Sequence, residues 1–249
     1  MTFVRWGLPT FFWSVLVLGW AVWLMPAGIP RYAMSAVAAL LILFIINFFR
    51  NPCHVPEGGA RSLIAPGEGV VADIIEIDEP RFVGGRCLRI GIFLSVFDVH
   101  VNRSPCPGTV RFAEYRPGSF LDARHPDVSH ANEANILGLE ADAAVQPGLK
   151  LLVTQLSGLI ARRIICTHGV GDRLGRGELF GMIKFGSRTE LFIPLSAQAE
   201  VKVKVGDRVV CGKTVVAELP DGAQPLRNQK QIAPAEPDNA LGLRAEPAL

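Results

Sequence analysis

The segment Leu179–Pro194, LFGMIKFGSRTELFIP, is a strand-like apolar run that contains one Gly-Ser bond, Gly186–Ser187. Glycine has no Cβ and tolerates a strained backbone, so a neighbouring hydroxyl can approach its carbonyl closely. Ser187 supplies that hydroxyl. A lone Gly-Ser pair most often marks a β-bulge or a tight turn, so its meaning depends on the rest of the chain.

Two long apolar runs lie near the N-terminus. Phe11–Ile29 and Ala33–Phe49 contain no charged residue, and each is close to the length that crosses a hydrocarbon core of about 30 Å. A short loop with Pro26, Gly28 and Pro30 separates them. The two runs therefore predict a hairpin of two membrane helices.

Residues 1–50 are predicted to be this membrane anchor. Arg5 and Arg50 flank its outer ends and Arg31 lies in the loop, a balance that favours both ends in the cytoplasm. Two alternatives stay open: a signal peptide that is cleaved near Ala27, and one span followed by a buried core helix.

Residues 51–220 are predicted to form a mainly β, sandwich-like domain of short strands. The segment VKVGDRVVCGKTVVAEL, residues 203–219, resembles the turn unit of biotinyl- and lipoyl-type sandwiches, and APGEGVVADI, residues 65–74, is its expected other half. The strand candidates are Gly69–Ile77, Cys87–Val96, Gly108–Ala113, Ala144–Val153, Ile160–Thr167, Leu191–Pro194, Glu200–Val205 and Thr214–Leu219.

Two polar segments differ from this β pattern. His125–Leu139 is turn-forming and is predicted to be a flap over a site or a membrane surface. The tail, residues 221–249, is rich in Pro, Ala and charge and is predicted to be disordered.

Charge and cysteine content narrow the class of protein. The net charge is only +2, and nothing in the sequence suggests a nucleic-acid partner. The five cysteines are odd in number and form no CxxC pair, which favours reduced thiols over a disulfide framework or a zinc ribbon.

Five segments, taken together and in order, resemble the phosphatidylserine decarboxylase proenzymes. The likeness is closest to the short, bacterial-type members with an N-terminal hydrophobic hairpin. The segments are FFRNPCHVP (residues 48–56), APGEGVVADI (65–74), FLSVFDVHVNRSP (93–105), QLSGLIARRIIC (155–166) and residues 175–194.

The resemblance implies a self-processing enzyme. The chain would cleave itself between Gly186 and Ser187, and Ser187 would become a pyruvoyl group, the only cofactor expected. Fragments 1–186 and 187–249 would stay together as a heterodimer, with further oligomerisation open. The enzyme would convert phosphatidylserine to phosphatidylethanolamine and CO₂ through a Schiff base. It would lie in the bacterial inner membrane, with its catalytic domain facing the cytoplasm.

The resemblance also assigns candidate catalytic residues beside Ser187 and Gly186. His100 in FDVHVN is the expected proton carrier, and Asp98, two residues earlier, is expected to orient it. Glu68 stands where the family usually has aspartate, in Pro-x-Asp-Gly. Larger members carry a second histidine where this chain has Arg103, so the base for self-cleavage stays open.

Four further residues are candidates for binding the lipid head group. Asn102, Arg103 and Arg188 could bind its phosphate or carboxylate, because arginine forks suit such anions. His168 in THGVGD is another candidate. For each of the first three alone, a surface salt bridge explains the residue better than a ligand contact does, and loop solvation explains His168 equally well.

Two other functions remain as alternatives. A membrane-anchored zinc peptidase of the lysostaphin-like class would need an H-x-H pair, and no two of the five histidines are separated by one residue. A non-catalytic, membrane-tethered adaptor with a biotinyl-like sandwich is the third interpretation.

Overall fold

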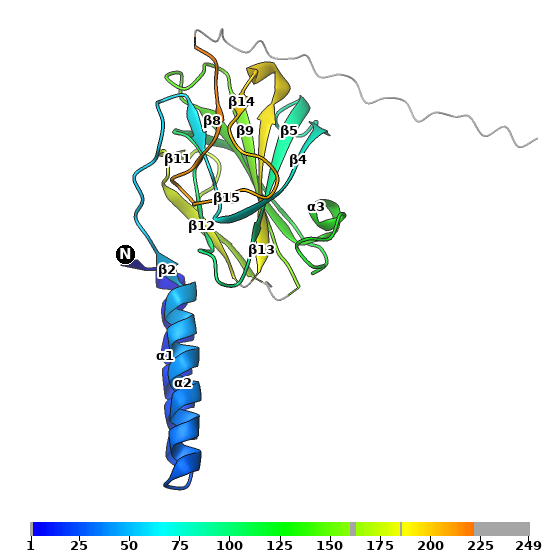
Figure 1. Ribbon diagram of the computed structural model, residues 1–249. Helices are drawn as coiled ribbons and strands as arrows, with labels where there is room; N and C mark the ends of the chain where they lie inside the picture. The colour runs from blue at the N-terminus through cyan, green and yellow to red at the C-terminus, as the bar shows by residue number, and fades with distance from the viewer. Residues whose placement is uncertain (1, 160–162, 185, 222–249) are drawn as a thin grey trace, which may run out of the picture.

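The computed structural model describes residues 2–159, 163–184 and 186–221. Within these residues the chain has two parts, a narrow helical hairpin and a β domain at one end of it (Figure 1). The tail that was predicted to be disordered lies, apart from Asp221, outside the described residues.

The hairpin consists of helices α1, Leu8–Leu24, and α2, Ile29–Phe48. A 3-10 turn, Arg5–Gly7, precedes α1. The segment Arg5–Leu24, which is the 3-10 turn with α1, and helix α2 are each long and apolar enough to cross a membrane, by length and composition, and only 6% of each apolar window is buried. Their outer ends are joined, because strand β1 (Thr2–Phe3) pairs with strand β2 (Arg50–Asn51) directly after α2.

The β domain is organised around one antiparallel sheet of eight strands, in the order β11-β7-β8-β9-β13-β5-β4-β15. Strand β13 lies inside this sheet and pairs with β5 on one side and β9 on the other. The eight strands are β4 (Gly69–Glu79), β5 (Gly85–Leu94), β7 (Gly108–Arg116), β8 (Ala134–Ala141), β9 (Lys150–Leu156), β11 (Arg173–Leu174), β13 (Ser187–Pro194) and β15 (Arg208–Val209).

Two small sheets complete the domain, and they have the orders β10-β12-β6 and β14-β16-β3. A short helix, α3 (Val128–Ala131), and a 3-10 turn (Leu195–Ala197) lie in the connections. The six strands are β3 (Ser62–Ile64), β6 (Val101–Arg103), β10 (Arg163–Cys166), β12 (Leu179–Lys184), β14 (Glu200–Val201) and β16 (Val215–Glu218).

The main core is made by apolar side chains of the large sheet and of the sheet β14-β16-β3. Ile90 and Leu191 come from the large sheet, and Leu63 and Val216 come from the small one. The predicted mainly β, sandwich-like class is therefore confirmed. The two biotinyl-like halves meet where β15 pairs with β4, whereas β16 pairs with β3, which ends just before residue 65.

The prediction for His125–Leu139 as a polar flap is wrong for its second half. Strand β8 begins at Ala134 and pairs with β7 and β9, and most of its residues are buried. Because Gly138 has no Cβ, Phe82 and Phe112 can pack against it. Their atoms lie within 2.8 Å of the position that a Cβ would take. Neighbouring strands and packing thus override a turn-forming composition.

The strand predicted for Ala144–Val153 starts too early. Backbone hydrogen bonds close a turn from Asp142 to Val145, and β9 begins only at Lys150. The thiol prediction is confirmed, since all five cysteines are free.

Candidate active site

The Gly186–Ser187 bond lies at the junction where β12 leads into β13. Ser187 is the first residue of β13, is fully buried and pairs with Leu94 of β5. Gly186 has φ of +66°, in the left-handed region that favours glycine. The preceding residue, Phe185, lies outside the described residues. The junction therefore combines a left-handed glycine with a buried serine.

The hydroxyl of Ser187 is unusual for a buried polar group. Its Oγ is enclosed and has no hydrogen-bond partner among the described residues. Leaving a buried hydroxyl unpaired costs about 1–3 kcal/mol. A nucleophilic serine needs a hydroxyl that is not held by another bond, and the Ser187 hydroxyl, next in the chain to the Gly186 carbonyl, meets this condition among the described residues.

His100 bonds to the Gly186 amide, one peptide before the Gly186–Ser187 bond. Its Nε2 accepts a hydrogen bond from the Gly186 N–H at 3.1 Å, and its Nδ1 lies 2.9 Å from the Asp98 carbonyl oxygen. A carbonyl only accepts and an amide N–H only donates, so the ring proton belongs on Nδ1 and the lone pair of Nε2 accepts the Gly186 N–H. This is the tautomer that a base facing the junction needs.

The histidine ring is dry. It is fully buried, and the ring of Phe48, the last residue of α2, lies against it at a centroid distance of 4.3 Å. Burial lowers the pKa of His100 from 6.5 to about 4, with the Asp98 backbone and carboxylate acting in the opposite direction. His100 is therefore neutral at pH 7 and available as a base.

Asp98 hydrogen-bonds to His100 through its backbone carbonyl, whereas its carboxylate bonds to other groups. One carboxylate oxygen accepts hydrogen bonds from the Ser95 amide and hydroxyl, at 2.8 and 2.7 Å. The other carboxylate oxygen pairs with Arg208 of β15 at 2.5 Å. The carboxylate thereby fixes the turn Ser95–Asp98, whose last carbonyl holds the imidazole.

We expect Arg208→Ala to slow self-cleavage about fivefold. The ion pair is partly exposed and of modest strength, but without it the nearly buried Asp98 carboxylate loses its cation and the turn loosens. The appearance of fragments after synthesis in vitro measures the rate, and Arg208→Lys should recover part of it. Arg173→Ala, which breaks the exposed pair with Asp142, is the matched control. Equal rates in the Arg208 and Arg173 variants would contradict this role.

Glu68 contacts the backbone next to His100 but does not bond to the His100 ring among the described contacts. Its carboxylate accepts from the Val99 amide at 3.3 Å and lies 3.6 Å from the Arg50 guanidinium. Arg50 also donates to the Phe97 carbonyl at 3.0 Å. Glu68 thus ties the end of the hairpin to the backbone beside His100.

Asn102 and Arg103 have their polar groups engaged within the protein. Asn102 bonds to the Thr189 hydroxyl and to the Gln155 amide, at 2.8 Å each. Arg103 donates to the Gly177 carbonyl at 2.8 Å and to Asn51. Among the described contacts, neither residue touches Ser187 or His100.

The side chains of Arg188 and His168 also make no contact with the Ser187 or His100 side chains among the described residues. Arg188 is 3% exposed and is enclosed by Asp73 and Glu190, and its side chain projects from the other face of β13 than Ser187 does. His168 lies 4.0 Å from the Glu178 carboxylate. Head-group binding by these residues stays a prediction.

Gly158 is a site residue that the sequence did not reveal. A Cβ at this position would stand 2.3 Å from the Gly186 carbonyl oxygen, so only glycine allows the 157–159 loop to lie against that carbonyl. Its position in QLSGLI, inside a matched segment, was the available signal.

We expect Gly158→Ala to reduce the rate of self-cleavage by tenfold or more. The added methyl group must displace the Gly186 carbonyl, and reacting groups lose much of their rate when they are misplaced by about 1 Å. The fragment assay measures the effect. Gly169→Ala, where a Cβ meets nothing within 4 Å, is the control. A wild-type rate for Gly158→Ala would refute the close approach.

The zinc alternative finds no support in the site. Across residues 2–159, 163–184 and 186–221, no group of three or more His, Cys, Asp or Glu side chains is placed to hold a metal ion.

Comparison with known proteins gives one consistent answer. A model of the family described as "Phosphatidylserine decarboxylase" matches residues 41–217. The "Phosphatidylserine decarboxylase proenzyme" of Symbiobacterium thermophilum is 49% identical over 190 residues, 76% of this chain and 86% of the relative. The proteins of the same name from Carboxydothermus hydrogenoformans and Rhodopirellula baltica are 40% and 38% identical, over 84% and 89% of this chain and 94% and 90% of the relatives.

Proposed function

The chain belongs to the phosphatidylserine decarboxylase family, and from this premise we propose that it is a proenzyme that cleaves its own Gly186–Ser187 bond and then decarboxylates phosphatidylserine. The product is phosphatidylethanolamine, with release of CO₂. Membership of the family makes it a decarboxylase. The bond that is cut, the cofactor and the roles of residues are our assignment.

The junction itself carries the proposal. The Ser187 hydroxyl is buried without a partner among the described residues, beside a left-handed glycine whose amide is bonded to a neutral histidine. Ester formation from a peptide needs a nucleophile beside the carbonyl and a base for its proton. His100 Nε2 becomes that base when it exchanges the Gly186 amide for the Ser187 hydroxyl.

The self-cleavage consumes one water molecule. Ser187 Oγ attacks the Gly186 carbonyl carbon, the C–N bond breaks, and an ester remains with a free amine on residue 187. Loss of the Ser187 α-proton and cleavage of its Cβ–Oγ bond release fragment 1–186 with a Gly186 carboxylate. The remaining dehydroalanine tautomerises, and water replaces its nitrogen as ammonia, which leaves a pyruvoyl group at the start of fragment 187–249.

The residues around Ser187 fit a pyruvoyl group. The Ser187 Oγ leaves with the Gly186 carboxylate, and no described residue bonds to this oxygen. A pyruvoyl carbonyl supplies an electron sink for the carbanion that remains when CO₂ leaves an amino acid. The protein's part is to exclude water and to carry protons. We assign to His100, which is neutral and buried, the return of a proton that it has taken up to the substrate carbon.

The two fragments are expected to remain together as a heterodimer. Strand β13 stays paired with β5 and β9, β15 with β4, and β16 with β3, and these pairings join residues before and after the cut. The Arg208–Asp98 ion pair also crosses the junction.

The hairpin is proposed to hold the enzyme in the bacterial inner membrane, with the β domain on the cytoplasmic side. The two apolar helices support membrane association, and the arginines at their outer ends favour this orientation. The lipid substrate then needs no carrier, because its acyl chains stay in the bilayer.

A denaturing gel of the purified protein tests the proposal. We expect one fragment of 186 residues and one of 63, counted from the Gly186–Ser187 bond over 249 residues. Mass spectrometry should find a blocked pyruvoyl terminus on the smaller fragment, and chelators should not reduce CO₂ release from phosphatidylserine. One intact band, or a free serine terminus, would refute it.

A further inference from the structure

Two exposed apolar side chains flank the Gly186–Ser187 junction. Phe97 is 68% exposed and Leu159 is 61% exposed. The Ser95–Asp98 turn reaches the junction through Val96, whose Cγ1 lies 3.8 Å from where a Gly186 Cβ would stand. The 157–159 loop reaches it through Gly158, which lies against the Gly186 carbonyl. Both apolar side chains are thus next neighbours of residues that touch the junction.

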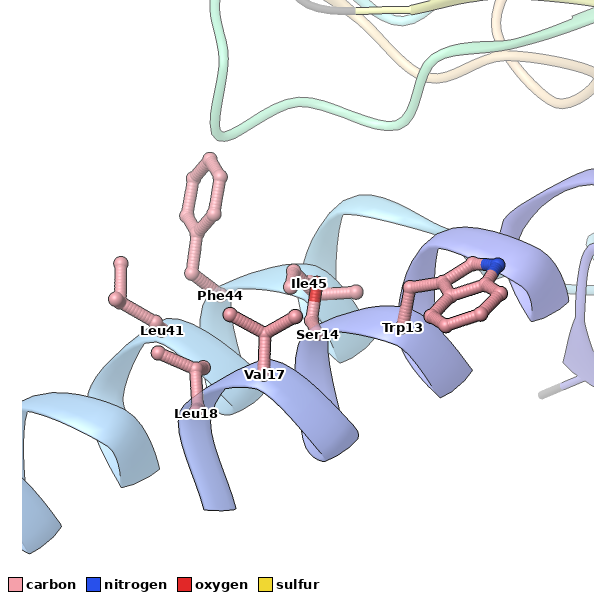
Figure 2. A pocket seen from close by; sticks show the side chains of 7 residues that line it. All are labelled: Trp13, Ser14, Val17, Leu18, Leu41, Phe44 and Ile45. Carbon is pink, nitrogen blue, oxygen red and sulfur yellow. The ribbon is translucent and has the colours of Figure 1, made fainter. Parts of the chain in front are cut away.

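The first of these loops also contacts the membrane helix. The Phe97 ring meets the Phe44 ring edge to face, with centroids 6.3 Å apart. Phe44 lies four residues before the end of α2, about 6 Å along the axis. Figure 2 shows Phe44 pointing away from the helices toward a loop of the β domain, at the edge of a groove of about 410 Å³ between α1 and α2. If α2 spans the bilayer, Phe97 lies at the level of its last turn.

Basic side chains lie on the same end of the β domain. Arg163 and Lys184 pair directly across β10 and β12, and no salt bridge joins either of them to a carboxylate among the described residues. Lys184 also donates to the Trp6 carbonyl at the start of the hairpin, at 3.2 Å. Apolar side chains with cations beside them suit the surface of an anionic bilayer.

We propose that the turn Ser95–Asp98 and the 157–159 loop dock on the surface of an anionic phospholipid bilayer, with Phe97 and Leu159 inserted at the interface. The inference rests on the proposed function and adds a second membrane contact to the hairpin. Single exposed apolar residues are common on proteins. Here the contact of Phe97 with a membrane helix makes the surface continuous with the anchor. The junction then faces the layer that holds the substrate head groups.

The test compares two substrates for the full-length protein. One is long-chain phosphatidylserine in phosphatidylcholine vesicles, and the other is dihexanoyl phosphatidylserine as a soluble monomer. For the double variant F97S/L159S we expect an apparent KM on vesicles raised about tenfold more than on the soluble substrate. The control V170S/V205S removes two side chains of similar exposure, 65% and 58%, from other loops and should behave as wild type. Equal losses on both substrates, or no loss on vesicles, would overturn the docking surface.

A second experiment measures how deeply residue 97 enters the bilayer, and it does not depend on enzyme activity. A fluorophore on Phe97→Cys, in a Cys53→Ser background that removes the exposed thiol, should be quenched by nitroxide lipids, whereas one on Val205→Cys should not. Equal quenching at both positions would contradict the proposal. Failure of the proposed function has a different signature, namely a wild-type protein that neither cleaves itself nor releases CO₂ from either substrate.

Discussion

Ser187→Ala is expected to give an intact chain of 249 residues that releases no CO₂. Alanine has no oxygen to attack the Gly186 carbonyl, so neither the cut nor the pyruvoyl group can form. The loss is complete rather than partial, because the same atom is needed for both. The gel and a CO₂ assay with vesicle-bound phosphatidylserine measure the two losses separately.

The same variant is expected to fold at least as well as the wild-type precursor. Ser187 Oγ is buried with no partner among the described residues, so its removal relieves a desolvation cost of about 1–3 kcal/mol. Ser187→Thr keeps a hydroxyl but adds a methyl group to a fully buried site, and should be the less stable of the two. Denaturant unfolding decides this. If Ser187→Ala is clearly destabilised, the hydroxyl has a structural partner and is not a waiting nucleophile.

The fold could be predicted in outline because its signals are local. The two charge-free runs become α1 and α2, and the glycine-punctuated β pattern becomes the strands around β13. The failure at Ala134–Ala141 has a non-local cause. That segment is a strand because β7 and β9 flank it, and no local pattern carries that information.

The sequence predicted which residues form the candidate site but not the contacts that hold them in position. The family likeness picked out Ser187, Gly186 and His100, which the structure brings together. It did not reveal that the Asp98 carbonyl, rather than its carboxylate, holds the ring. Gly158 and Arg208 escaped notice because their effect depends on contacts with residues 28 and 110 positions away.

His100→Gln is expected to slow self-cleavage by about 10²–10⁴, the usual contribution of a positioned acid–base group. Glutamine can still accept a hydrogen bond from the Gly186 amide but cannot take a proton. The fragment assay measures the rate. A loss below threefold would move the role of base to another residue, with Glu68 the next candidate because it is bonded to the neighbouring amide.

The pH dependence separates a base from a structural histidine. The His100 pKa is lowered from 6.5 to about 4, so the wild-type rate should stay level from pH 7 to about 5 and fall as His100 becomes protonated near pH 4. The free energy of unfolding should also decrease as the pH falls. The unfolded chain binds the proton first, so the stability contribution present above pH 6.5 is lost as the pH falls to 4, by about 3 kcal/mol in all. Unfolding of Ser187→Ala with and without His100→Gln, at pH 7 and 4.5, measures this.

In the proposed mechanism, the cause of that lowered pKa makes the hairpin part of the active site. Phe48 ends the second apolar helix and covers the ring of His100. Replacing it with alanine would admit water, raise the pKa of His100 toward 6.5 and shift the fall in rate to higher pH. Phe44→Ala, one turn earlier on the same helix and not stacked on His100, should leave that pH midpoint unchanged. If both variants keep a midpoint near pH 4, the hairpin does no more than tether the enzyme.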